Sequence, residues 1–292
     1  MPALVEHPSA GAFLERAGPW LREREDHHNL ILSLARSRAA VGSGVPMGGP
    51  EAKRAPEALF GSVEEGGRVV GCVACVAPYR ALLTALPIEA APAVGALLAE
   101  RFHELPGIVG PRPIGLAVAR CWAEVRGGSF REGMRQGLYR LESVVQTTRT
   151  SGRMRVAGAE DSGLARAWCE AFAQETGIDY AVTEATLDRW LGAGALWLWE
   201  VDGEAGGMAV AQGRTAHGIR IGFVYTPPHL RGRGHASGLV GALSQKMLDD
   251  GCAFCVLYTD LANPTSNAIY GRLGYEPIGE VVDVHLIASG AS

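Results

Sequence analysis

The chain has 292 residues, of which 47% are hydrophobic and 20% charged, and its formal net charge is −4. This composition is typical of a compact protein with one large domain or two of ordinary size. The small acidic excess gives no indication of a nucleic-acid partner or of binding to an anionic membrane.

The opening segment, MPALVEHPSAGAFLERAG, lacks the basic stretch and apolar core of a secretory signal. No apolar run approaches the ~20 residues that a membrane-spanning helix needs. We therefore predict a cytoplasmic protein with no membrane partner, present as a monomer or a homodimer.

Two segments of similar pattern indicate an internal repeat. EGGRVVGCVACV (65–76) and DGEAGGMAVAQG (202–213) both show an acidic turn, then a small apolar strand that contains glycine, with Gly67 matching Gly203 and Gly71 matching Gly207. We predict two copies of one fold, residues 1–146 and 153–292, separated by the polar stretch 144–153.

In the second half the pattern predicts a mixed α/β domain. We expect strands over 153–159, 195–201, 206–212, 218–226, 253–259 and 279–286, and helices over 161–176, 183–191, a segment ending at Asp250, and 263–273. Trp190, Trp197 and Trp199 fit the core of this domain, although they could instead line an acceptor pocket.

Two C-x-x-C pairs, Cys72/Cys75 and Cys252/Cys255, raise the possibility of zinc. Both pairs fall in strand-like runs, where residues i and i+3 point to opposite faces and cannot bind one ion together. We therefore predict buried cysteines and no metal site.

The segment HLRGRGHASGLVGAL (229–243) places glycines and arginines between a strand and a helix. Such a turn is either an ordinary loop or a site where backbone N–H groups and the helix dipole hold a phosphate. Gly232-Arg-Gly234-His-Ala-Ser237 lacks the third glycine of a Rossmann fingerprint, and the lysine of a P-loop is missing.

Arg231-Gly-Arg-Gly234-His-Ala236 resembles the R/Q-x-x-G-x-G/A signature of the GNAT superfamily of acyl-CoA N-acyltransferases. The preceding strand FVYTP, the following helix SGLVGALSQKMLDDG and the later NPTSNAIYGRLGY extend this resemblance over residues 153–286. It implies two GNAT-like mixed-sheet domains flanked by helices, with a splayed strand pair in the C-terminal one. The N-terminal half looks like a degenerate copy, in which GIVGPRPIG (107–115) is the nearest counterpart of the loop.

By this resemblance, acetyl-CoA is the cosubstrate and an amine, small-molecule or peptide, is the acceptor. Binding of the cofactor falls to Val224, Tyr225, Thr226, Arg231, Gly232, Arg233, Gly234, His235, Ala236, Ser237, Asn263 and Asn267. Tyr270 takes the role of general acid for the departing thiolate. Asn263 also precedes Pro264 as a helix N-cap would.

The general base is left open, because Tyr258 occupies the place of the glutamate that some family members carry. Asp260, Glu175 and Tyr225 are candidates, as is a chain of water molecules. The resemblance implies an N-acetyltransferase, and a non-catalytic acyl-CoA-binding module is the alternative.

Overall fold

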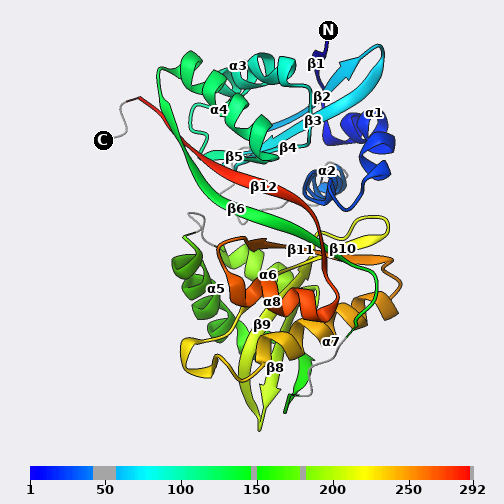
Figure 1. Ribbon diagram of the computed structural model, residues 1–292, viewed down its shortest axis with the longest axis vertical. Helices are drawn as coiled ribbons and strands as arrows, with labels where there is room; N and C mark the ends of the chain where they lie inside the picture. The colour runs from blue at the N-terminus through cyan, green and yellow to red at the C-terminus, as the bar shows by residue number, and fades with distance from the viewer. Residues whose placement is uncertain (42–56, 146–149, 178–181, 290–292) are drawn as a thin grey trace. The chain divides into compact units, whose positions relative to one another are not determined.

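The computed structural model of the protein describes residues 1–41, 57–145, 150–177 and 182–289 (Figure 1). The elements of the first half are β1 (Ala3–Glu6), α1 (Ala10–Glu23), α2 (Asn29–Val41), β2 (Ala58–Glu65), β3 (Arg68–Val76), β4 (Ala81–Leu83), the 3-10 helix η1 (Ile88–Ala90), α3 (Ala91–Arg101), β5 (Gly107–Gly110), α4 (Arg112–Arg126) and β6 (Ser129–Leu141).

The second half repeats this order of elements. It contains β7 (Arg153–Val156), η2 (Ala159–Asp161), α5 (Ser162–Thr176), α6 (Glu184–Gly192), β8 (Leu196–Val201), β9 (Glu204–Gln212), β10 (Gly218–Tyr225), η3 (Pro228–Leu230), α7 (His235–Asp249), β11 (Phe254–Asp260), α8 (Pro264–Leu273) and β12 (Glu276–Ile287). Apart from the 3-10 helices, both halves read β-α-α-β-β-β-α-β-α-β, so the predicted repeat of one fold agrees with the element order.

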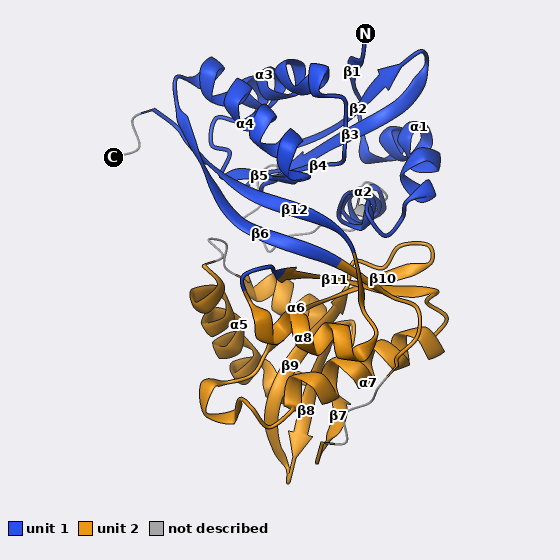
Figure 2. Ribbon diagram, in the orientation of Figure 1, with its two compact units in different colours: residues 1–138, 260–262, 278–292 blue, residues 139–259, 263–277 orange. Residues whose placement is uncertain are grey.

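The chain forms two compact units (Figure 2). Unit 1 comprises residues 1–138, 260–262 and 278–292, and unit 2 comprises residues 139–259 and 263–277. Residues 278–292, which the sequence analysis grouped with the C-terminal half, therefore lie in unit 1. The boundaries 1–146 and 153–292 stay a prediction about the repeat, and residues 146–149 of the expected break fall outside the described residues.

Each unit places two pairs of helices on opposite faces of its strands. In unit 1 the core residues of α1 and α2 pack on one face of β2 and β3, and those of α3 and α4 pack on the other. In unit 2 the side chains of α5 and α6 share a core with β8, β9 and β10, while α7 and α8 build a second core with the same strands and β11. The mixed-sheet fold with flanking helices is as predicted.

The last strand of the chain completes unit 1. The strand order there is β1-β2-β3-β4-β5-β12-β6, and β12 pairs antiparallel with β5, with Val282 opposite Gly110 and Val284 opposite Ile108. Val282, Val284 and Leu286 alternate into the core beside α3 and α4. The alternating pattern predicted the strand correctly, but the core that it joins belongs to the other unit.

The end of strand β6 lies in unit 2. Its last residues, 139–141, belong to unit 2, where Leu141 lies in the core with α7 and Arg140 covers the Phe254 ring of β11. The remaining order of unit 2 is β11-β10-β9-β8-β7. Most of β6, residues 129–138, thus lies in unit 1 together with β12, and only its last three residues belong to unit 2.

The element order corrects one expectation about the first half. Residues 107–115 span β5 and the start of α4, the place that β11 and α8 hold in the second half. The counterpart of the glycine turn lies between β4 and α3, in the glycine-free segment TALPIEA (84–90). There Leu86 is buried against Gly71, which has no room for a Cβ.

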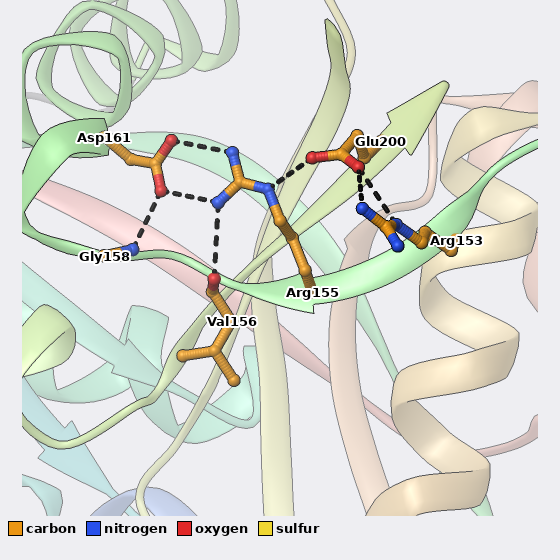
Figure 3. A network of polar contacts seen from close by, with 6 residues as sticks. All are labelled: Arg153, Arg155, Val156, Gly158, Asp161 and Glu200. Carbon is orange, nitrogen blue, oxygen red and sulfur yellow. Dashed lines mark hydrogen bonds and ion pairs between the residues drawn. The ribbon is translucent and has the colours of Figure 1, made fainter. Parts of the chain in front are cut away.

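A polar network fixes the entry to α5 in unit 2 (Figure 3). Arg155 of β7 donates through both terminal nitrogens to the Asp161 carboxylate, at 2.7 and 2.8 Å, and through Nε to Glu200 of β8 at 2.8 Å. Asp161 also accepts from the Gly158 N–H at 2.8 Å, and Arg153 donates to Glu200 at 2.7 Å. These charge-assisted bonds tie β7, β8 and the beginning of α5 together.

All four cysteines of the two C-x-x-C pairs are buried as predicted. The expectation of opposite faces is wrong for Cys252 and Cys255, because Cys252 precedes β11 and lies in the same core as Cys255. Cys72 packs in the core under α1 and α2, and Cys75 in the core under α3 and α4, so the two thiols of this pair occupy opposite faces of β3. Burial raises the pKa of Cys75 and that of Cys255 to about 12. Thiols with such pKa values are not thiolate nucleophiles near neutral pH.

Candidate functional site

The end of strand β10 is distorted by a bulge. Its antiparallel register with β9 shifts between Gly222 and Tyr225, and Phe223 between them has a positive φ of 50°. A positive φ is uncommon for a residue with a large side chain. The Phe223 ring packs on Trp190 and Phe172, at centroid distances of 4.8 and 5.2 Å, and this aromatic packing holds the bulge in place.

Strands β10 and β11 open beyond a short paired segment. Among the described residues, their parallel register covers residues 218–220 and 254–256, although β10 continues to Tyr225 and β11 to Asp260. The pair therefore splays toward its carboxyl ends, as the fold prediction requires. The ends of neighbouring parallel strands meet at one edge, and the loops into α7 and α8 begin there.

The turn from β10 to α7 has two glycines with left-handed backbones. Gly232 has φ 78° and Gly234 has φ 83°, values that residues with a Cβ rarely adopt. Arg231 closes the turn, because its Nε donates to the Thr226 carbonyl over 2.9 Å. No heavy atom lies within 4 Å of a Cβ placed on Gly232, so the space beside this residue is open among the described atoms.

Helix α7 begins without a capping side chain. Its N-cap is Gly234, whereas Thr183 accepts from the Thr186 N–H at the start of α6 and Asn263 accepts from the Ser266 N–H at the start of α8. The first-turn N–H groups of a helix have no intrahelical partners, so they can bind a phosphate where no side chain caps them. Helices α3, α4 and α5 also lack a side-chain cap, but of these four helices only α7 begins at a glycine turn with left-handed backbones. The amides predicted to bind the cofactor, at residues 235–237, lie in this turn.

Close packing fixes this helix against the sheet. A Cβ on Gly238 would lie 2.8 Å from the Trp199 ring, and one on Gly241 would lie 3.1 Å from Leu273. Trp197 and Trp199 lie in the same core, as expected. The donors at the start of α7 are therefore held by rigid elements, and the residues fit a diphosphate that needs several backbone N–H groups at one point.

Helix α8 carries the remaining predicted site residues. Asn263 caps the helix through its side chain, and the Asn267 N–H donates to the Asn263 carbonyl over 3.2 Å. Tyr270 is buried two turns further on, edge-on to Tyr275 at 5.9 Å. Burial raises the pKa of Tyr270 to about 12, so its hydroxyl stays protonated and can donate a hydrogen bond.

All thirteen predicted site residues lie in unit 2, distributed over the end of β10, the glycine turn, the start of α7 and α8. Their roles toward a ligand stay predictions. Both arginines have internal partners: Arg231 donates to Glu175 at 2.5 Å as well as to Thr226, and Arg233 donates to the His229 carbonyl at 3.3 Å. The Tyr225 hydroxyl donates to Glu175, and the Asn263 side chain accepts from the Ser266 N–H.

The candidates for a base have different surroundings. The Asp260 carboxylate accepts from the Ala262 N–H at 2.9 Å, as a turn-forming aspartate does. Glu175, in the last turn of α5, accepts from the Tyr225 hydroxyl at 3.3 Å and from Arg231. Burial and the nearby Glu175 charge raise the pKa of Tyr225, so its hydroxyl is a donor here.

Sequence reasoning missed Phe172 and Phe223. Phe223 lies in a strand pattern that gives no signal for a positive φ, and Phe172 lies within the helix expected over residues 161–176. Trp168 and Phe172 are four residues apart and therefore share one face of the helix. This spacing was the available sequence signal for an aromatic face close to Glu175.

The geometry defines a mixed α/β domain with a splayed strand pair and an uncapped, glycine-led helix at its edge. Residues 165–275 match the model of the Acetyltransferase (GNAT) family. The described residues contain no helix long and apolar enough to cross a membrane. A search of curated proteins found no match.

Solved structures show the same fold over the whole chain. A Drosophila protein aligns with a TM-score of 0.69 at 14% identity, covering 97% of this chain and 98% of that protein. A GCN5-related N-acetyltransferase from Sphaerobacter thermophilus has a TM-score of 0.60 at 16% identity, covering 100% and 97%. A tandem GNAT protein from the clavulanic acid biosynthesis pathway has a TM-score of 0.54 at 14% identity, covering both chains completely.

Residues 165–275 therefore resemble a GNAT acetyltransferase domain, and the whole chain has the fold of a solved tandem GNAT protein. The general reaction of this family is transfer of an acyl group from acetyl-CoA to an amine.

Proposed function

We propose that this protein is an N-acetyltransferase that transfers an acetyl or other short acyl group from acetyl-CoA to a primary amine by direct attack. The observation that carries this proposal is the start of α7, where an N-cap glycine in a left-handed conformation leaves the first-turn amides without a side-chain cap. Such a turn suits the diphosphate of coenzyme A.

Each part of the site has a role under this proposal. The N–H groups of residues 232–237 bind the diphosphate, with Arg231 holding the turn closed. The end of β10, Val224 to Thr226, supplies backbone groups along the pantetheine arm and donors toward the thioester oxygen, where negative charge develops during attack. Asn263 and Asn267 contact the cofactor from α8.

Tyr270 acts on the leaving thiolate as a hydrogen-bond donor. Its pKa of about 12 exceeds the ~8.5 of a free thiol, so complete proton transfer from Tyr270 to the sulfur would be uphill. A hydrogen bond from the protonated hydroxyl stabilises the developing negative charge without that transfer. The effect of Tyr270 on the rate is then modest.

The cofactor site is tested with Ala236→Glu, which adds a negative charge among the first-turn amides. We expect acetyl-CoA affinity, measured by calorimetry, to fall by at least about a hundredfold, because the added carboxylate repels the diphosphate and competes for its donors. Gln245→Glu is the matched control, since it adds the same charge at an exposed position in the same helix and should leave the affinity unchanged.

Catalysis is tested separately by release of free thiol from acetyl-CoA in the presence of a panel of primary amines. Turnover that requires both substrates supports the transferase. Tight binding of acetyl-CoA with no turnover across a broad panel would favour the non-catalytic acyl-CoA-binding module instead. If Ala236→Glu left the affinity for acetyl-CoA unchanged, the assignment of the diphosphate site to the start of α7 would be wrong.

A further inference from the structure

Aromatic side chains and one carboxylate surround the bulged end of β10 on the face covered by α5 and α6. Phe223 contacts Phe172 and Trp190, and Tyr225 lies 6.1 Å from Trp168, centroid to centroid. Trp168, Phe172 and Phe223 are only half-buried, unlike the fully packed aromatics of a core. We call Trp168, Phe172, Trp190, Phe223 and Tyr225 the β10 aromatic cluster.

Glu175 lies beside this cluster, one turn beyond Phe172 on α5. One carboxylate oxygen accepts from the Tyr225 hydroxyl at 3.3 Å and the other from Arg231 at 2.5 Å. These two bonds fix the position of the carboxylate. An ionised carboxylate has about four acceptor sites, and the Glu175 side chain is 40% exposed, so it can accept further hydrogen bonds from a ligand.

The position of these groups relates them to the proposed reaction. If the diphosphate binds at the start of α7 and the carrier arm follows β10, the thioester carbonyl reaches the bulge at residues 222–225. An amine that attacks this carbonyl must bind next to the same strand end. Glu175 contacts Tyr225 there. The other rings of the β10 aromatic cluster pack on Tyr225 and Phe223 from the face opposite to α7.

We infer that Glu175 binds the ammonium group of the acceptor and that the β10 aromatic cluster binds its apolar body. The bound ammonium releases one proton to water before its nitrogen attacks the thioester carbonyl, and the thiolate leaves as the C–N bond forms. This inference rests on the proposed transferase function and adds the substrate class to it. Trp168, Phe172 and Phe223 leave part of each ring exposed beside the fixed carboxylate, and such rings attract a cation that carries an apolar or aromatic group, through ring contact and cation–π attraction. They offer few hydrogen-bond partners to a polyhydroxylated amine and a single negative charge to a polyamine.

The acceptor class is tested by comparing 2-phenylethylamine, glucosamine and spermidine as probes. We expect 2-phenylethylamine to give the highest kcat/KM of the three, by about tenfold or more. Glu175→Gln keeps the size of the side chain and removes its charge, so KM for 2-phenylethylamine should rise about tenfold. KM for acetyl-CoA should change less than this, because Arg231 keeps its bond to the Thr226 carbonyl when the ion pair with Glu175 is lost.

Glu170→Gln is the control for this variant, because Glu170 is an exposed residue on the same helix, outside the cluster. It should leave both KM values unchanged. Phe172→Leu, which keeps an apolar side chain, should raise KM for 2-phenylethylamine and leave KM for glucosamine unaltered.

A binding measurement separates this inference from the proposed function. Calorimetry with 2-phenylethylamine on the protein saturated with coenzyme A should detect binding that weakens at least about fivefold in Glu175→Gln, whether or not turnover occurs. Absence of binding, equal binding in Glu175→Gln, or a preference for spermidine or glucosamine would overturn the inference. Loss of acetyl-CoA binding to the wild-type protein would instead remove the proposed function.

Discussion

Gly206 of β9 lies directly against the imidazole of His235, the first residue of α7, and a Cβ at residue 206 would overlap Nδ1 of that ring. His235 is only 7% exposed, and the backbone of β9 leaves no room for its ring to move toward residue 206. The geometry of the proposed phosphate-binding turn depends on a glycine that is distant in sequence from its own signature.

Gly206→Ala should displace His235 and with it the first turn of α7. Overpacking of this kind costs about 1–3 kcal/mol, and it misplaces the amides that are proposed to bind the diphosphate. We expect a lower melting temperature together with at least about tenfold weaker binding of acetyl-CoA, measured by calorimetry.

Gly163→Ala is the matched control for this glycine substitution. Gly163 lies in helix α5, and no heavy atom comes within 4 Å of a Cβ placed there. Alanine favours the helix by up to ~1 kcal/mol, so this variant should be equally or more stable and should bind acetyl-CoA normally. Normal binding in Gly206→Ala would show that the start of α7 does not position the ligand.

Tyr270→Phe removes the hydroxyl that is proposed to assist the leaving thiolate. Because this hydroxyl contributes one hydrogen bond to the transition state, we expect kcat to fall about tenfold with KM for acetyl-CoA almost unchanged. Its pKa of about 12 also predicts that Tyr270 adds no limb to the rate profile below pH 10, since the group stays protonated throughout.

Tyr275→Phe serves as the comparison for the second tyrosine of this pair. The Tyr275 hydroxyl bonds to Ser244 at 2.8 Å in the core, so its removal should lower stability and leave kcat unaltered. Equal kcat in wild type and Tyr270→Phe would exclude the assigned role for Tyr270.

Local chemistry made much of unit 2 predictable from sequence. Gly232 and Gly234 require a turn, Pro264 follows an N-cap at Asn263, and Gly251 lies just past the end of α7, so the elements fall within a few residues of their expected bounds. These features depend on neighbours along the chain. The same is true of the opposite orientation of Cys72 and Cys75.

The features of the fold that could not be predicted depend on contacts between residues that are distant in the sequence. Phe223 has a positive φ where its ring packs on Trp190 and Phe172, and no local sequence pattern predicts that contact. The alternation of Val282 and Val284 shows that one face of β12 is buried, but it does not identify the core that buries it. Glu175 meets Arg231 across 56 residues of sequence.

Val284→Ala tests the contribution of the last strand to unit 1. Val284 is fully buried between β5 and the helices α3 and α4, so truncation should cost about 2 kcal/mol. Hydrogen exchange should become faster in the amides of β5 and α4 while those of α7 and β10 keep their protection. Ile287→Ala, at the exposed end of β12, should change stability by less than about 0.5 kcal/mol. Faster exchange confined to unit 2 would contradict this assignment.

Arg155→Ala breaks the network at the entry to α5. It leaves the Asp161 carboxylate, 9% exposed, without its guanidinium partner, so we expect a loss of about 2 kcal/mol, or a melting temperature lower by about 5 °C. Arg153→Ala is the control, because the Arg153 side chain is 78% exposed and its solvent-screened ion pair with Glu200 should contribute little to stability.

The same network predicts a dependence of stability on pH. The hydrogen bonds from Arg155 lower the pKa of Asp161, and those from Arg153 and then Arg155 lower the pKa of Glu200. Carboxyl groups with lowered pKa values stabilise the fold above their unfolded pKa values of ~4, and this contribution is lost as the pH falls through the folded values. The wild-type melting temperature should therefore decrease below about pH 5, and the decrease should be shallower in Arg155→Ala. Parallel curves for the two proteins would show that Arg155 does not lower the pKa of these carboxyl groups.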